Sequence, residues 1–433
     1  MQNFLKYFLH PSKELKRYFA NTSWILFEKL IRTFAYFIIG IWIVRYLGPT
    51  EYGLLAYAQS IIYFFIGIAS LGLDEIVVRE LVAYKDKSKK LLGTALILKL
   101  SVSVLILSCI LILIYFFGNS GKASYMIIIL GFSIVFLSTT VANFYFQYAV
   151  MLKYTSIANI IAVASTSLIK IFLILFEYDV IYFAIVLSLE ALLLSILLAY
   201  FLLTKAKISL FSLSFDKKMA INLLRDSWPL IFIGIFINIY LKVDQIMITQ
   251  LIGAAENGKY SAALLLSEGF YFIPMVICAS VFPKILQAKN NYELYDLRLR
   301  RLYFLMFWMA VIIAVSITLL SRFLILSFFG TEFEDSISVL VIHIWTCIFI
   351  FLGVANSKYL ISENLQSYYF ICTFIGAITN IILNFYFIKN FGIIGAAWSS
   401  LISYALASYL CLVLFSKTRN SFFRINKSIL YFK

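Results

Sequence analysis

The feature that most constrains this chain is a series of apolar stretches, each long enough to cross the hydrocarbon core of a bilayer. A membrane-spanning helix needs roughly 20 mainly apolar residues, and we count twelve such stretches. They lack the alternation of polar and apolar residues that the strands of a membrane barrel show, so we expect an all-α polytopic membrane protein. The expected helical spans are 23–46, 55–72, 92–117, 124–148, 156–176, 180–203, 228–250, 260–282, 302–329, 336–356, 367–388 and 393–415.

The composition excludes several other classes of protein. Of the 433 residues, 63% are hydrophobic and only 13% are charged, although the net charge is +15. A soluble enzyme of this size needs more polar surface, and a nucleic-acid partner is not expected because the basic residues are thinly spread among apolar runs. The two histidines cannot build a histidine metal site, and no ATP-binding G-x-x-x-x-G-K-[ST] motif occurs. The five cysteines lie in apolar stretches and predict no disulfide framework: Cys109, Cys278, Cys347, Cys372 and Cys411.

Lysine and arginine report the orientation of the spans. Alternate loops hold 26 of them on one side and 4 on the other, which predicts both termini in the cytoplasm. The basic N-terminus has no cleavage site of a signal peptide, so we expect an interfacial helix there. The expected organisation is an interfacial helix at 1–22, an N-lobe at 23–203, a cytoplasmic inter-lobe loop at 204–227, a C-lobe at 228–415 and a cytoplasmic tail at 416–433.

The chain also repeats itself after about half its length. Ser23-Trp24 returns as Ser227-Trp228, and the G-x-x-E-x-G pattern of 48–53 returns at 253–258. With six spans in each half, both halves enter the membrane from the same side, so the repeat is parallel. Two such lobes predict a central cavity and a rocking secondary transporter, and the glycines of the repeated pattern are expected at turns with positive φ.

Ten charged residues fall within the expected spans, and Arg45 at the outer end of the first span is counted with its loop. Each costs roughly 2.5–3.5 kcal/mol at a helix centre on the insertion scale. They must therefore face a wet cavity, pair with one another, or extend to the membrane surface. These residues are Glu28, Lys29, Arg32, Lys99, Lys170, Glu190, Lys242, Asp244, Glu268 and Arg322.

We interpret four of these cations as the lining of a lumen that binds an anionic, hydroxyl-rich substrate: Arg32, Lys99, Lys170 and Lys242. Polar stripes at helical spacing accompany them, as a solvated lumen requires. The stripes contain Asn143, Gln147, Asn159, Asn238, Gln245, Asn380 and Asn384. The structural alternative is pairing between helices or extension of the side chains to the membrane surface, which is favoured for Lys99 and Arg322 near the ends of their spans.

Several further residues are candidates for ion pairs or gates. Glu28 and Arg32 are four residues apart and are expected to pair, whereas Asp244 should face a neighbouring helix because it is two residues from Lys242. The remaining candidates are Asp74, Glu75 and Arg79 at the inner end of the second span, where simple membrane anchoring is the alternative, and Glu268. His343 suits proton coupling by its ordinary pKa, and a packed role is the alternative.

Four patches together resemble the polysaccharide transporter branch of the MOP exporter superfamily, the Wzx-type O-antigen flippases. They are IVRYLGPTEYG at 43–53, LGLD and VREL at 71–74 and 78–81, KVDQIMI at 242–248, and FGIIGAAW at 391–398. The family motif carries over by position to Arg79 and Asp244.

The resemblance implies the MOP flippase fold and a flippase of the bacterial inner membrane. Such a protein moves undecaprenyl-diphosphate-linked repeat units of O-antigen or capsule, as in lipopolysaccharide synthesis, from the cytoplasmic to the periplasmic leaflet. An H⁺ or Na⁺ gradient drives it by alternating access, and no other cofactor or metal is expected. Membrane lipids and a polysaccharide polymerase or chain-length regulator are the partners to consider.

Two other functions compete with this interpretation. A membrane-embedded polysaccharide polymerase or ligase would need a large periplasmic loop with catalytic residues, and no loop between the expected spans exceeds about 24 residues. A multidrug cation antiporter of the same superfamily would need an acidic pocket, whereas the expected spans contain more lysine and arginine than aspartate and glutamate. We therefore expect a transporter and no enzyme.

Overall fold

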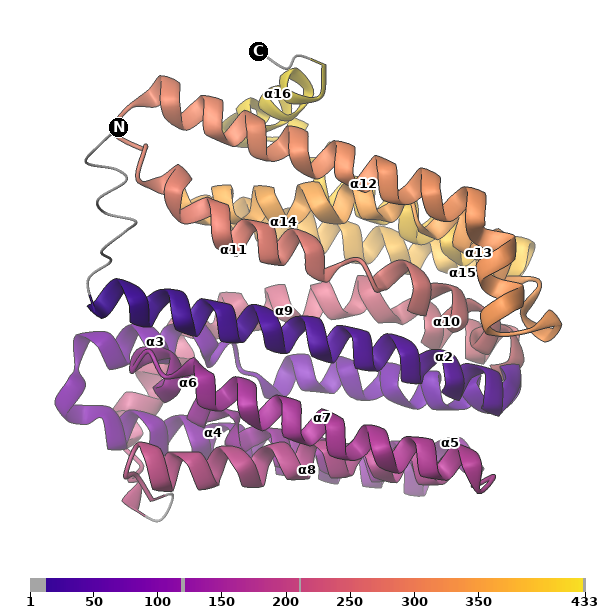
Figure 1. Cartoon of the computed structure of the whole chain (residues 1–433), viewed down its shortest axis with the longest axis horizontal. Helices are drawn as coiled ribbons and strands as arrows, with labels where there is room; N and C mark the ends of the chain where they lie inside the picture. The colour runs from indigo at the N-terminus through magenta and orange to yellow at the C-terminus, as the bar shows by residue number, and fades with distance from the viewer. Residues whose placement is uncertain (1–12, 118–120, 210–211, 431–433) are drawn as a thin grey trace. The chain divides into compact units, whose positions relative to one another are not determined.

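The computed structural model describes residues 13–117, 121–209 and 212–430, and these ranges contain helices and no strand (Figure 1). The predominance of helix confirms the expected all-α class. The α-helices are α2 (Lys13–Ala69), α3 (Leu73–Ala83), α4 (Ser88–Phe117), α5 (Lys122–Phe136), α6 (Val141–Tyr148), α7 (Leu152–Leu175), α8 (Val180–Lys205), α9 (Lys217–Leu251), α10 (Ala254–Glu268), α11 (Phe272–Leu286), α12 (Tyr292–Phe328), α13 (Ser336–His343), α14 (Thr346–Ser362), α15 (Gln366–Ser408) and α16 (Ser416–Leu430). Short 3₁₀ turns are η1 (Lys85–Lys87), η2 (Leu137–Thr140), η4 (Thr331–Phe333) and η5 (Leu410–Val413).

The described residues contain ten stretches that are long and apolar enough to cross a membrane, and two of these stretches are double. The first covers 61 residues and the last covers 48, which as straight helices would measure about 90 and 70 Å against a core of about 30 Å. Non-helical glycines divide both: Gly48 (φ 67°, ψ 177°) within α2 and Gly392 (φ 59°, ψ −141°) within α15. Counted on each side of these glycines, the stretches correspond to the twelve expected spans.

Three expected spans are interrupted in the middle, which the hydropathy pattern did not predict. The span at 124–148 contains α5, η2 and α6, the span at 260–282 contains α10 and α11, and the span at 336–356 contains α13 and α14. In η2 the Thr139 and Thr140 hydroxyls donate to carbonyls three residues earlier, a local bond that competes with regular helix. The interruption before α11 precedes Pro274, whose ring is tolerated in the first turn of a helix but not in its interior.

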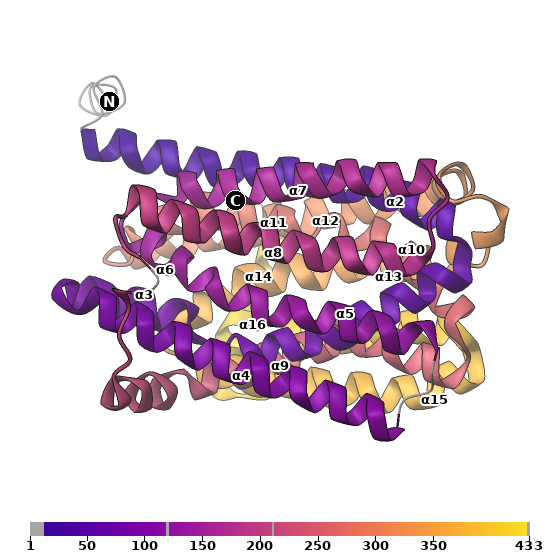
Figure 2. The same ribbon diagram turned by 90° about the horizontal axis from the view of Figure 1, so that it is seen from below.

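By their contacts, the helices form two compact units. Unit 1 comprises Met1–Tyr36 and Ile68–Ile231, and unit 2 comprises Phe37–Gly67 and Phe232–Lys433. In unit 1, α8 packs against both α5 and α7, and Figure 2 shows α7 and α8 side by side. In unit 2, α14 packs between α12 and α15. These units place residues 37–67 with the second half of the chain, whereas the expected N-lobe at 23–203 includes them. The boundaries of the two lobes stay a prediction.

Two segments expected as a loop and a tail are helical. Helix α9 begins at Lys217, within the expected inter-lobe loop. Helix α16 lies in the expected tail and packs along α12, and Figure 1 shows the two helices next to each other. Its buried side chains recur at 418, 421, 425 and 428, the spacing of an amphipathic helix with one packed face. Of the expected interfacial helix at 1–22, residues 13–22 are continuous with α2, and 1–12 lie outside the described residues.

Large apolar side chains remain exposed along the outer faces of the helices. Leu105 on α4, Leu168 on α7 and Leu319 on α12 are all more than two-thirds exposed. A soluble protein rarely leaves such extensive apolar surface in water. The chain is therefore a multi-pass membrane protein, and these side chains face lipid.

The repeated G-x-x-E-x-G patterns meet one another within unit 2. Gly48 and Gly253 both have positive φ and extended ψ, as expected, and each precedes a new helical segment. Gly53 and Gly258 do not, so the expectation of turn glycines is wrong for them. They are helical, and a Cβ on Gly53 would lie 1.8 Å from the Ala254 carbonyl oxygen.

The second contact mirrors the first. A Cβ on Gly258 would lie 1.8 Å from the carbonyl oxygen of Pro49, which occupies the position of Ala254 in the first repeat. Asn257 closes the crossing by donating to the Gly53 carbonyl at 2.8 Å. The two repeats therefore cross backbone to backbone around a local two-fold relation.

We predict that Gly258→Ala destabilises the protein by about 3 kcal/mol or more, because a backbone clash cannot be relieved by rotating a side chain. The measurement is the midpoint of thermal unfolding of the purified protein in detergent. Gly234→Ala is the matched control, since a Cβ there meets nothing within 4 Å. Equal midpoints for the two variants would contradict the close crossing.

Candidate ion and substrate site

Two of the expected lumen cations, Arg32 and Lys99, lie beside carboxylates in unit 1. Arg32 Nε is 3.2 Å from Glu28 Oε1, which confirms the pair expected from their spacing on α2. Lys99 Nζ is 3.9 Å from Asp74 Oδ1 and donates a hydrogen bond to Thr140 at 3.1 Å. The Lys99 ammonium is nearly desolvated while Asp74 is exposed. Each cation is thus compensated within its own unit.

Lys170 forms the most buried of these pairs. Its Nζ is 2.9 Å from Glu190 Oε2, and the two side chains are only 5% and 14% exposed. Thr166 donates to the same carboxylate oxygen at 2.9 Å, and the Tyr36 hydroxyl donates to the other. The Lys170 ammonium also lies 5.7 Å from the centre of the Tyr36 ring, a cation–π distance. These contacts connect α2, α7 and α8.

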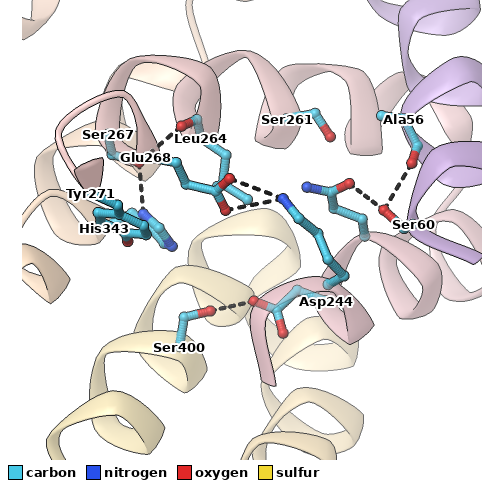
Figure 3. A network of polar contacts seen from close by, with 12 residues as sticks. Ala56, Ser60, Asp244, Ser261, Leu264, Ser267, Glu268, Tyr271, His343 and Ser400 are labelled. Atoms are coloured by element: carbon cyan, nitrogen blue, oxygen red, sulfur yellow. Dashed lines mark hydrogen bonds and ion pairs between the residues drawn. The ribbon is translucent and has the colours of Figure 1, made fainter. Parts of the chain in front are cut away.

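Lys242 forms a more accessible pair in unit 2. Its Nζ is 2.9 and 3.2 Å from the two oxygens of Glu268, and the side chains are 19% and 25% exposed. Figure 3 shows Glu268 on α10 with dashed lines that mark these two contacts of its carboxylate. One turn along α9, Gln245 accepts a hydrogen bond from Ser60 of α2. The Lys242–Glu268 pair is therefore more open than the Lys170–Glu190 pair to exchange of its carboxylate for another anion.

Two interrupted spans meet beside this pair. Helix α10 ends at Glu268 and α13 ends at His343. Ser267 Oγ lies 2.8 Å from His343 Nδ1, and the Tyr271 and Thr346 hydroxyls are 2.7 Å apart across the two interruptions. Figure 3 shows Ser267, His343 and Tyr271 together at this point. These side-chain hydrogen bonds join the two helices, while the backbone groups at the interruptions are bonded locally, as where Tyr271 N–H donates to Glu268 and the Thr346 hydroxyl donates to the His343 carbonyl.

His343 is fully buried at this junction. Its ring packs edge-on against the rings of Tyr260 and Tyr404, with centroids 6.2 and 6.3 Å away. Its Nε2 has no hydrogen-bond partner within the described ranges. The environment is that of a packed histidine, and its role in proton coupling stays a prediction.

Asp244 occupies a separate polar cluster in unit 2. Its side chain meets neighbouring helices, as its offset from Lys242 predicts. Tyr260 on α10 donates to Oδ2 at 2.7 Å and Asn384 on α15 donates to Oδ1 at 2.6 Å. Ser400, also on α15, donates to Oδ2, a bond drawn in Figure 3. The residue is 2% exposed.

This buried carboxylate has only neutral hydrogen-bond donors. Within the described part of the chain, Lys242 pairs with Glu268 and not with Asp244. Asn384 Oδ1 is buried without a hydrogen-bond partner among the described residues. Carboxylate, hydroxyl and amide oxygens are the ligands that hard cations prefer, and a proton would also neutralise the carboxylate. The cluster has the chemistry of a site for a small monovalent cation.

Arg79 on α3 contacts Asp226 on α9. Its guanidinium is 3.0 Å from Glu80 and 2.8 Å from Asp226. The Arg79 side chain is 58% exposed, and exposed pairs contribute little stability. A gating role for this end of the bundle stays a prediction.

The remaining expected polar residues are spread through both units. Asn380 and Asn384 on α15 belong to the Asp244 cluster, whereas on α9 Gln245 bonds Ser60 and Asn238 donates to the Gly234 carbonyl. Those on α6 and α7 lie elsewhere, in unit 1. Asn380, Asn384 and Gln245 are buried, Asn143, Asn159 and Asn238 are half-buried, and Gln147 is exposed. Lys29 is half-buried, and Arg322 is exposed and lies 3.4 Å from Glu334.

Among the participants that sequence reasoning left unassigned are Glu190, Tyr260 and Ser400. Glu190 carried a signal, because it is one of few carboxylates inside an expected span. Tyr260 and Ser400 carried none, since a tyrosine or a serine is ordinary in a membrane helix. Only the fold brings them to Asp244.

Ion pairs within an all-helical membrane bundle define the chain as a polytopic protein with a functional polar interior. A family model described as "Polysaccharide biosynthesis protein" matches residues 18–289, more than half of the chain. The chain therefore belongs to this family, which confirms the expected resemblance to polysaccharide transporters. The comparison with curated proteins gave no match.

Solved structures with a similar fold come from the MOP superfamily. An inward-facing multidrug resistance MATE family transporter is 17% identical, with a TM-score of 0.74 over 92% of this chain and 96% of that one. The lipid II flippase MurJ in an inward closed conformation is 18% identical, with a TM-score of 0.73 over 95% and 91%. A MOP superfamily transporter from Pyrococcus furiosus is 16% identical, with a TM-score of 0.53 over 95% and 94%. These similarities confirm the MOP fold.

We predict that Lys170→Met lowers stability by about 3–5 kcal/mol, because it leaves Glu190 charged and unpaired in a buried site. The double variant Lys170→Met/Glu190→Leu should regain most of this loss, since removing both charges is often neutral. Thermal unfolding of the purified protein in detergent measures both. A double variant as unstable as the single one would show that the pair is not the source of the loss.

Proposed function

We propose that this chain is a secondary transporter that flips lipid-linked oligosaccharides across the membrane. The substrate is an undecaprenyl-diphosphate-linked repeat unit of O-antigen or capsule, and it moves from the cytoplasmic to the periplasmic leaflet of the bacterial inner membrane. Family membership supports the polysaccharide link, and the MOP fold supports transport. The uneven distribution of lysine and arginine supports termini in the cytoplasm.

The observation that carries the proposal is the Lys242–Glu268 pair within the bundle. Glu268 occupies two hydrogen-bond positions of the Lys242 ammonium, which has three donors. A diphosphate carries more charge than one carboxylate and makes strong charge-assisted hydrogen bonds. It can therefore compete for Lys242, while polar side chains such as Gln245 and Ser60 offer partners for sugar hydroxyls.

The energetic logic differs from that of an open cationic lumen. Each expected cation is already paired, so the empty protein does not bear the cost of several unpaired charges in a low-dielectric interior. Substrate binding then exchanges one ion pair for another.

We place the coupling cation, H⁺ or Na⁺, at Asp244. The cluster offers a carboxylate and neutral oxygens with no basic residue paired to it in the described ranges. Cation binding removes the uncompensated charge and should tighten the packing of α9, α10 and α15. Because packed interfaces have discrete arrangements, such a change can favour one state of alternating access.

A multidrug cation antiporter is the second candidate, because the MATE fold is as similar as the MurJ fold. Asp244 could then serve a cationic substrate directly. Membership of the polysaccharide family favours the flippase. So does the pairing of Glu190 with Lys170 and of Glu268 with Lys242, because these carboxylates are already compensated. A polysaccharide polymerase or chain-length regulator would act on the flipped product and is the expected partner.

We predict that Lys242→Ala abolishes surface polysaccharide while the protein remains in the membrane. Glu268→Gln, which leaves the cation, should retain part of the activity, and Lys389→Ala on an exposed position is the control. The assay is complementation of a deletion strain, in which repeat units should accumulate on the cytoplasmic leaflet. Accumulation on the periplasmic leaflet would support a polymerase, and efflux of cationic dyes by the wild type would support the antiporter.

We predict that Asp244→Asn removes the dependence of flipping on the ion gradient. The amide keeps the size of the side chain but cannot balance a cation. The measurement is flipping of a fluorescent lipid-linked oligosaccharide in proteoliposomes, with a proton gradient or a sodium gradient imposed separately. An Asp244→Asn variant that responds to either gradient like the wild type would refute the assignment of Asp244.

A further inference from the structure

Unit 2 contains a cavity that the proposed flipping cycle does not use. It measures about 70 Å³ and lies between α9, α14, α15 and η5. Its polar lining comprises Tyr240, Asn356, Ser357, Tyr369, Thr373 and Ser408. One water molecule needs about 10–15 Å³ of such volume and two to four polar partners. The cavity therefore has room and hydrogen-bonding groups for several waters.

The cavity lies one layer away from the Asp244 cluster. Tyr240 is one turn before Asp244 on α9, and Tyr404 is one turn after Ser400 on α15. The Tyr240 and Tyr404 rings meet edge to face with centroids 5.2 Å apart, and together with Ala377 they form a small buried cluster. Tyr240 also lines the cavity, so this aromatic layer of Tyr240, Tyr404 and Ala377 adjoins the cavity and lies one turn from residues of the Asp244 cluster.

Hydrogen-bonded polar side chains also link the cavity to α16. Asn356 lines the cavity, and its Oδ1 accepts hydrogen bonds from Ser421 of α16 at 2.6 Å and from Tyr303 of α12 at 3.3 Å. The loop charges predict this end of the bundle on the cytoplasmic side. Polar groups therefore extend from that end, through the cavity, to the aromatic layer.

We propose that this cavity is a water-filled compartment through which the coupling cation passes between Asp244 and the α16 end of unit 2, with the Tyr240–Tyr404 layer as its gate. The proposal rests on the proposed function, since it assumes that Asp244 binds a small monovalent cation. Hydroxyl and amide oxygens with trapped water replace part of the hydration shell of the ion. Rotation of either tyrosine ring would connect the cavity with the Asp244 cluster.

The first test asks whether a monovalent cation enters the cavity. In the full-length protein without its native cysteines, Ser408→Cys places a thiol on the lining, and Ag⁺ is the probe. Ag⁺ added from the predicted cytoplasmic side should protect this thiol from later alkylation in denaturant. Restored Cys278, which is buried away from the cavity, is the control and should stay unprotected. No protection of the Ser408→Cys thiol overturns the proposal.

The second test fills the cavity. Ser357 and Ser362 both lie on α14, both are half-buried and both bond a carbonyl three residues earlier, but only Ser357 lines the cavity. Ser357→Leu should lower cation flux in proteoliposomes about tenfold or more, because a dehydrated route is costly for an ion. Ser362→Leu is the matched control and should leave the flux near the wild-type rate.

Separate gradients identify the ion. The Asp244→Asn variant distinguishes failure of the cavity route from failure of the proposed function. Flux is measured with a proton gradient without sodium, and with a sodium gradient at equal pH. Loss of flux in Asp244→Asn together with wild-type flux in Ser357→Leu overturns the cavity route and leaves the coupling site intact. Wild-type flux in Asp244→Asn overturns the proposed coupling site itself. Equal losses in Ser357→Leu and Ser362→Leu would assign the effect to packing and also overturn the route.

Discussion

The cost of placing a charge in a medium without water governs the interior of this protein. A lysine or glutamate within a membrane helix must have a partner, because neither lipid nor a dry bundle hydrates it. The pairs of Lys170 with Glu190 and of Lys242 with Glu268 satisfy this constraint, and hydrogen bonds from Thr166 and Tyr36 complete the first of them. Asp244 satisfies it differently, through neutral donors on two helices. The pairs let the protein keep charges in the bilayer until a substrate or an ion exchanges with them.

The same constraint explains why the interrupted helices lie where they do. An interruption releases backbone groups, which lipid cannot satisfy. At the ends of α10 and α13 local bonds satisfy these groups, such as the Thr346 hydroxyl donating to the His343 carbonyl, and side-chain bonds between Ser267 and His343 and between Tyr271 and Thr346 join the two helices. These two interruptions occur next to the ion pair of Lys242, inside unit 2. The crossing of Gly53 and Gly258 supplies the opposite element, a rigid backbone contact that leaves no space for a side chain.

Much of the architecture could be predicted from local pattern. The hydropathy of the spans, the basic loops and the repeated G-x-x-E-x-G motif depend on neighbours in sequence, and they predicted the helical class, the number of spans and the pairing of Glu28 with Arg32. The interruptions of three spans could not be predicted, because the side chains at them bond residues far along the chain, such as Ser267 with His343 and Thr139 with Ser195. Gly53 and Gly258 were wrongly expected at turns for the same reason. Their partners lie about 200 residues away, so no local signal distinguishes a turn glycine from one at a helix crossing.

The candidate site shows the same division. The sequence by itself determined that charged residues lie within the membrane and that they cannot stand alone, because hydration energy depends on the residue type and its depth. Only the tertiary structure decided that Lys170 and Lys242 face carboxylates and that Tyr260, Asn384 and Ser400 surround Asp244. Ion pairing and hydrogen bonding require atoms within about 3 Å, and that proximity arises from the packing of helices distant in sequence.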